Sequence, residues 1–223
     1  LCAPIETALH PAVNQEGYKI ATARERPAQP KFLKTSHVAI DQFGSHAVVV
    51  LQPVELLAPS AVAIGAGGTG LVDTTGVDHF ECYKTGPVRQ APKFLPPPLV
   101  SVTDEIHRTA LLALTRITKL CTPVDKNGED VTAPQHVGHL LCYQAKQQLV
   151  KLAPVTLSVN NTNFGPATLV AKSIAELCVP AFKDVVPTAT PSPTPTGTPS
   201  STLTPTPTAA PTATPTPTPP TTP

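Results

Sequence analysis

The chain has 223 residues, of which 14% are charged and 4% are aromatic, and its formal net charge at pH 7 is +1. A charge this close to zero gives no electrostatic case for a nucleic-acid or anionic-membrane partner. No apolar run approaches the roughly 20 residues that a membrane-spanning helix needs. The apolar residues are mainly Val, Leu, Ile and Ala, interrupted by Pro and Gly at short intervals. This pattern predicts an all-β protein of short strands and turns.

The first segment, residues 1–16, contains Cys2 within LCAPIE, which matches LCTPVD at residues 120–125. We interpret it as the end of a preceding sequence repeat whose first half is not in the chain. Cys2 would then be the second cysteine of a bridge without its partner. Three explanations remain open. The chain is a fragment of a longer array, a neighbouring molecule completes the incomplete repeat, or Cys2 is a free thiol.

Three copies of one repeat follow. They are copy one (17–77), copy two (78–137) and copy three (138–186). Each copy has two anchor positions: the first anchors are Gly17, Cys82 and Cys142, and the second anchors are Leu57, Cys121 and Cys178. Copy one lacks both cysteines, as expected if the two anchors are bonded to each other wherever cysteines are present. The repeat therefore predicts the disulfides Cys82–Cys121 and Cys142–Cys178, and with them an oxidising compartment.

Within the copies, alternating apolar segments and polar turns recur in the same order and predict strands. The candidate strands are 17–23, 36–41, 46–51, 53–57, 61–64, 78–84, 98–103, 110–118, 138–145, 154–159, 167–173 and 175–179. Residues 108–120 could be mistaken for a helix. We assign a strand because the aligned segment AVVVLQP is β-branched and contains proline. Tandem repeats of about 60 residues made of such strands predict one or two β-sandwich-like domains.

Two motifs suggest chemistry, and each has a simpler interpretation. GAGGTG at 65–70 fits G-x-G-x-x-G, but turn and strand residues follow it where a nucleotide site needs a helix, so we expect a flexible loop. His136 and His139 form H-x-x-H, which on a strand would point to opposite faces. His139 also has a repeat counterpart in His79, which favours a structural role. No nucleophile elbow or usefully spaced carboxylate pair occurs, so no catalytic residue, cofactor or metal site is predicted, and we expect no enzyme.

The final segment, residues 187–223, holds 13 Pro and 15 Thr and carries no charge. Such sequence favours polyproline II and is typical of an O-glycosylated stalk, although a bare extended linker has the same composition. The predicted O-glycosylation sites are Thr188, Thr194, Thr196, Thr204, Thr206, Thr216 and Thr218. Asn160 begins an N-glycosylation sequon that is expected to lie in a turn.

The pattern HFECYK…LCTPVDKNG…HLLCYQ…LCVPAFK, followed by a Pro/Thr tail, resembles secreted bacterial repeat proteins with CYK and LCxPV motifs. In its organisation the chain is also similar to subunits of glycan-coated extracellular fibrils. These resemblances imply an extracellular, secreted or cell-surface β-repeat protein and carry no catalytic residues. If the start in mid-repeat is natural, the incomplete repeat exposes an unpaired strand edge that the next molecule can complete. We therefore expect a structural subunit that associates with itself head to tail and bears covalent glycans. The alternative is an adhesin or carbohydrate-binding module on a Pro/Thr stalk.

Overall fold

The computed structural model describes residues 14–23, 26–71, 76–106, 108–148 and 152–184. It separates Leu1–Val186 from Pro187–Pro223, and the predicted tail sites and Cys2 lie outside the described residues. The first unit is all-β, as predicted, and among the described residues its only helical element is the short 3₁₀ turn η1 (Ala133–Gln135). The strands are β1 (Asn14–Lys19), β2 (Thr35–Asp41), β3 (Gly44–Ile64), β4 (His79–Pro87), β5 (Val100–Asp104), β6 (Arg108–Val124), β7 (His139–Gln148), β8 (Val155–Asn161), β9 (Gly165–Ala171) and β10 (Glu176–Lys183).

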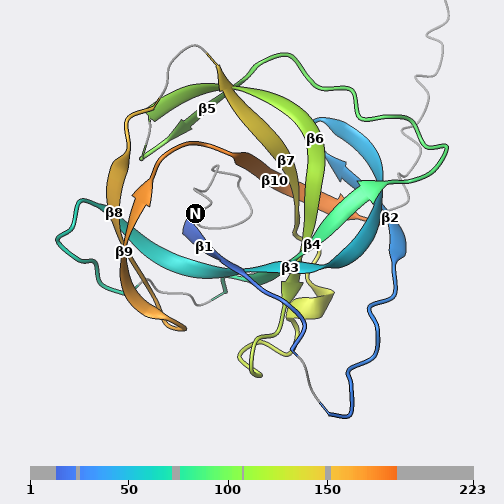
Figure 1. Ribbon diagram of the computed structural model, residues 1–223, viewed down its shortest axis with the longest axis horizontal. Coiled ribbons are helices and arrows are strands. Elements are labelled where there is room, and N and C mark those ends of the chain that lie inside the picture. The colour runs from blue at the N-terminus through green and yellow to red at the C-terminus, as the bar shows by residue number, and fades with distance from the viewer. Residues whose placement is uncertain (1–13, 24–25, 72–75, 107, 149–151, 185–223) are drawn as a thin grey trace, which may run out of the picture. The chain divides into compact units, whose positions relative to one another are not determined.

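Six of these strands form a closed antiparallel ring in the order β2-β3-β4-β6-β7-β10, with β10 pairing back onto β2 (Figure 1). The ring closes where Phe182 and Lys183 pair with Ile40 and Ala39. β1 and β5 add to β3 and β6, and the β8–β9 hairpin extends the far end of β3. Apolar side chains of β2, β3, β6, β7 and β10 meet in one buried core, whose removal from water is the main stabilising contribution.

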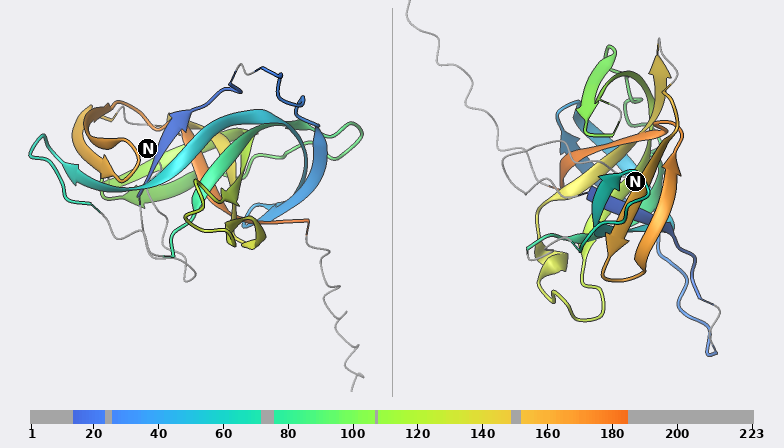
Figure 2. Two further views of the ribbon diagram at one scale, coloured as in Figure 1. Left: turned by 90° about the horizontal axis from the view of Figure 1, so that it is seen from below. Right: turned by 90° about the vertical axis from the view of Figure 1, so that its left-hand side faces the viewer.

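The long strands β3 and β6 curve strongly, and Figure 2 shows β3 as one continuous ribbon. β3 joins three segments that the sequence predicts as separate strands. Two register shifts, next to Gln52 and Pro53, let it bend while it stays paired with β4. The segment 108–120 lies in β6, so the prediction of strand over helix is confirmed.

One pairing scheme recurs three times along the chain. A first strand and a middle strand pair with the two ends of a long strand: β1 and β2 with β3, β4 and β5 with β6, and β7 and β8 with the β9–β10 segment. Within each copy the two anchors lie directly opposite each other, as Gly17 and Leu57 do. β1 begins at Asn14, before the boundary predicted at residue 17, because Asn14 already pairs with Ser60.

Candidate functional site

Two disulfides lie side by side where the anchors meet. The structure joins Cys82 to Cys121 and Cys142 to Cys178, which is the pairing that the repeat predicts. Each bridge links directly opposite residues of neighbouring antiparallel strands, with 3.9 Å between the Cα atoms. The Sγ atoms of Cys121 and Cys142 are 3.8 Å apart, so the bridges of copies two and three are in contact.

Leu57 takes the place of a cysteine in copy one. Its side chain is 1% exposed and packs against Cys82, Cys121 and Cys142. Opposite it, a Cβ added to Gly17 would lie 2.3 Å from the Glu55 Oε1 atom and 3.2 Å from the Leu57 Cδ2 atom. The Leu57 and Glu55 side chains therefore occupy the space that a side chain at residue 17 would need. Copy one therefore packs Gly17 against Leu57 at the place where the other two copies have a disulfide.

A charged cluster of three side chains crosses the same region. Glu55, Lys119 and Glu176 each lie two residues before the second anchor of their copy. The Lys119 ammonium group donates to Glu55 and, at 2.6 Å, to Glu176 Oε2. Burial alone would lower the pKa of Lys119, but the hydrogen bonds and charges of Glu176 and Glu55 outweigh it and raise that pKa. The cluster ties the three copies together at one point.

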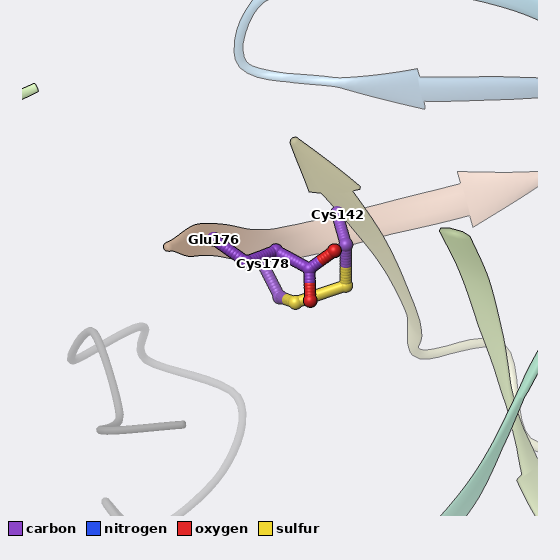
Figure 3. Close-up of side chains that lie close together, drawn as sticks. All are labelled: Cys142, Glu176 and Cys178. Atoms are coloured by element: carbon purple, nitrogen blue, oxygen red, sulfur yellow. A yellow bond between two sulfur atoms is a disulfide. The ribbon is translucent and has the colours of Figure 1, made fainter. Parts of the chain in front are cut away.

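Sequence reasoning missed this cluster, although the repeat alignment places its three members at one position. Glu176 lies against the Cys142–Cys178 bridge (Figure 3). Cys142, Glu176 and Cys178 bring sulfur and oxygen atoms close together, but the two sulfur atoms are bonded to each other. Thiolate ligation of a metal therefore requires reduction first.

The two histidines of the H-x-x-H motif have different surroundings. His136 Nδ1 lies 2.7 Å from Asp78 Oδ1, and its Nε2 lies 3.9 Å from Asp130 Oδ2. The hydrogen bond to Asp78 is the main cause that raises the pKa of His136. His139 is buried and hydrogen-bonds to the Val137 carbonyl oxygen instead, and burial lowers its pKa. Since each nitrogen of His136 faces a different carboxylate, the geometry is that of an ion-paired histidine that fastens its loop.

The glycine-rich segment 65–70 is a loop after β3, as expected. Its amides are used within the chain, because Gly68 N donates to Ser158 Oγ at 3.0 Å and Gly65 N donates to the Thr156 carbonyl oxygen at 2.8 Å. Asn160 lies in β8 and not in the predicted turn, because its backbone pairs with both β3 and β9. Its side-chain amide donates to the Thr69 carbonyl oxygen at 3.1 Å, so attachment of a glycan there requires that contact to break.

Copies one and three contact each other reciprocally. The hydroxyl of Tyr143, in the first strand of copy three, donates to Oδ2 of Asp41, the last residue of β2, at 2.5 Å. At the matching positions, Nδ2 of Asn161, the last residue of β8, donates to the Tyr18 hydroxyl of copy one at 2.8 Å. A phenylalanine in the β2–β3 turn and one in the β8–β9 turn also contact the tyrosine rings. The ring centroids of Phe43 and Tyr143 are 5.4 Å apart, and those of Phe164 and Tyr18 are 3.9 Å apart. Burial raises the pKa of both tyrosines, that of Tyr18 to about 12.

Within the described residues, β1, β5 and β9 each have a partner strand on one side only. β1 and β9 belong to the first and the last copy of the repeat, so their open edges lie at opposite ends of the series. β1 pairs with β3 on one side, and β9 pairs with β8 on one side. Edge strands present unpaired backbone donors and acceptors, and they are the usual sites of strand addition. These two edges are the part of the described structure that best fits a functional role.

A comparison of the chain with protein-family models, with curated proteins and with solved structures gives no match. Among the described residues, no helix has the length and apolar character needed to cross a membrane.

Proposed function

We propose that the protein is a structural subunit of an extracellular filament or surface assembly and that it associates with further copies of itself head to tail. The observation that carries this proposal is the pair of open strand edges, one on β1 and the other on β9. Edges on different elements make a head-to-tail contact, which propagates without closing unless the rotation between subunits forms a ring.

Two further features support an extracellular structural role. The disulfides are compatible with an oxidising compartment. The uncharged Pro/Thr tail would coat or bridge subunits, since such sequence gains nothing from burial and is a common O-glycan carrier.

A carbohydrate-binding module usually offers exposed aromatic platforms, and the tyrosines are poor candidates for this purpose. The Tyr18, Tyr83 and Tyr143 hydroxyls bond to Asn161, Glu81 and Asp41, respectively. Three phenylalanines are exposed, but they lie on separate segments, and two of them already pack on tyrosine rings: Phe32 on Tyr83 and Phe164 on Tyr18. We therefore favour the structural role.

Electron microscopy and light scattering of the purified full chain over a range of concentrations test this proposal. We expect filaments or concentration-dependent oligomers with a regular repeat. A monodisperse monomer at high concentration, together with binding on a glycan array, would replace the proposal with the binding-module alternative.

A further inference from the structure

The chain contains the same joint between successive copies twice. The long strand β3 pairs with β4 of the next copy, and the long strand β6 pairs with β7 of the next copy. Both joints carry two register shifts at matching distances from the anchors. The shifts lie between Val50/Gln52 and Pro53/Glu55 in the first joint, and between Leu114/Arg116 and Ile117/Lys119 in the second. The joint is therefore one defined piece of geometry that the fold uses repeatedly.

The third long strand lacks such a partner within the described residues, and its backbone differs in the matching place. Residues 172–175 separate β9 from β10, whereas the corresponding residues 51–54 and 115–118 are strand in β3 and β6. The first strand of copy one is also short: β1 ends at Lys19, while β4 and β7 continue through the positions that match residues 20–22. Both segments that would form a third joint, residues 20–22 and residues 172–175, are therefore not in strand conformation in the single chain.

Burial shows the same contrast. Three positions of the long strands are buried in copies one and two and partly exposed in copy three. They are Val48, Leu112 and Leu169, then Val50, Leu114 and Ala171, then Leu57, Cys121 and Cys178. In the first two copies the next first strand lies beside these residues. Within the described residues, copy three instead has an open strand edge along residues 168–178, here called the slot, at which these side chains are only partly buried.

We propose that this slot binds β1 and residues 20–23 of a second copy of the chain as an added antiparallel strand. This inference rests on the proposed function and specifies its contact. The two internal joints fix the register. A residue four positions after a first anchor pairs with the residue eight positions before the preceding second anchor, as Gly86 does with Val49 and Lys146 with Ala113. The corresponding pair between molecules is Ala21 with Val170.

The two segments are suited to this pairing. Neither residues 14–23 nor residues 168–178 contain proline, so no residue of either segment lacks a backbone amide for the ladder. Ile20 of the incoming strand takes the place of Thr85 and Ala145, which are buried in the internal joints, and it lies opposite Ala171. Ile20 and Ala171 are both partly exposed in the single chain, so pairing removes apolar surface from water.

A cysteine cross-link tests the register. In a full-length Cys2→Ser background, the double variant Ala21→Cys/Val170→Cys should form a ladder of covalent dimers, trimers and larger species on mild oxidation or with a short bismaleimide. Peptide mapping should join residue 21 of one chain to residue 170 of another. The matched control is Thr22→Cys/Val170→Cys, because adjacent strand residues point to opposite faces, and it should lose most of the ladder.

A second pair of variants tests the slot without added thiols. Val170 and Val137 are both exposed, at 52% and 71%, but only Val170 lies in the slot. Val170→Arg should abolish assembly at concentrations where Val137→Arg assembles like the parent, and both should keep the parental melting temperature. Filaments without the 21–170 link, or filaments of Val170→Arg, would overturn the joint and leave the filament function standing. A cross-link within one monomer would also overturn the joint. Absence of both assembly and cross-link would overturn the joint and the filament function.

Discussion

The absence of a side chain at Gly17 determines where Glu55 and Leu57 lie. Glu55 and Leu57 share the space that a side chain at residue 17 would need, and Glu55 in turn pairs with Lys119. The loss of a cysteine at this position is therefore linked to the ion pair between copies one and two. Any side chain at residue 17 would compete with that pair.

Gly17→Ala should destabilise the fold by about 1 kcal/mol, because the new methyl group displaces the Glu55 carboxylate from Lys119 and crowds the Leu57 side chain. Thermal or urea unfolding measures this change. Gly67→Ala is the control, since a Cβ there meets nothing within 4 Å, and it should change stability by less than about 0.5 kcal/mol. Equal stability of the two variants would show that Glu55 relaxes at no cost.

The pKa of His136 should lie above the usual histidine value of about 6.5, and those of His79 and His139 should lie below it. The Asp78 contact raises the pKa of His136, whereas burial lowers the pKa of His79 and of His139. The stabilising contact of His136 is then fully present below pH 6.5 and is lost as the pH rises through its raised folded value. NMR titration of the ring resonances checks the order. A His136 resonance that titrates below that of His139 would contradict the ion pair.

At the scale of strands, the repeat alignment could predict most of the pairing within a copy. Opposite anchors on antiparallel strands explain why two cysteines are replaced together, so Cys82–Cys121 and Cys142–Cys178 follow from the sequence. The middle strands show the limit. The apolar segments 38–40 and 100–102 are similar in sequence, which would match Val38 with Val100. Pairing with β3 and β6 instead puts His37 in the place of Val100. The β2–β3 turn is one residue shorter than the β5–β6 turn, and sequence similarity over three residues does not detect this difference.

Cys82→Ser should cause disulfide exchange and not only the loss of one bridge. The freed Cys121 thiol lies 3.8 Å from Cys142 Sγ and can attack it, giving Cys121–Cys142 and a free Cys178 thiol. Peptide mapping under non-reducing conditions detects the new bridge. The Cys82→Ser/Cys121→Ser control should keep Cys142–Cys178 and lose about 4 kcal/mol, the chain-entropy value for a loop of about 40 residues. An unchanged Cys142–Cys178 bridge in the single variant would show that the sulfurs cannot align.

At the scale of the whole molecule, closure of the ring could not be read from the sequence. It depends on β10 pairing with β2, which joins copy three to copy one. The β3–β8 pairing outside the ring also joins these two copies, which are not neighbours in the chain. Repeats usually contact only the next repeat, and local similarity carries no signal for a longer-range contact. The open edges of β1 and β9 could not be predicted from the sequence either, because they are recognised only when the strand pairing of the internal joints is known.

The Pro/Thr tail is predicted to be glycosylated in native material. Intact mass should exceed the 23.2 kDa of the bare chain and fall on deglycosylation, and the tail should resist a broad-specificity protease only while glycans are present. An unmodified peptide covering residues 187–223 would contradict this prediction and leave the bare-linker interpretation.

The reciprocal tyrosine contacts have a consequence for how the protein unfolds. In an ordinary linear array the terminal repeat can melt while the others persist, because only nearest neighbours interact. Here Tyr143 and Tyr18 fasten copy one to copy three across copy two, so release of either end also removes contacts of the other. The described unit should therefore melt in a single cooperative transition and refold slowly, since its decisive contacts join residues far apart in the chain.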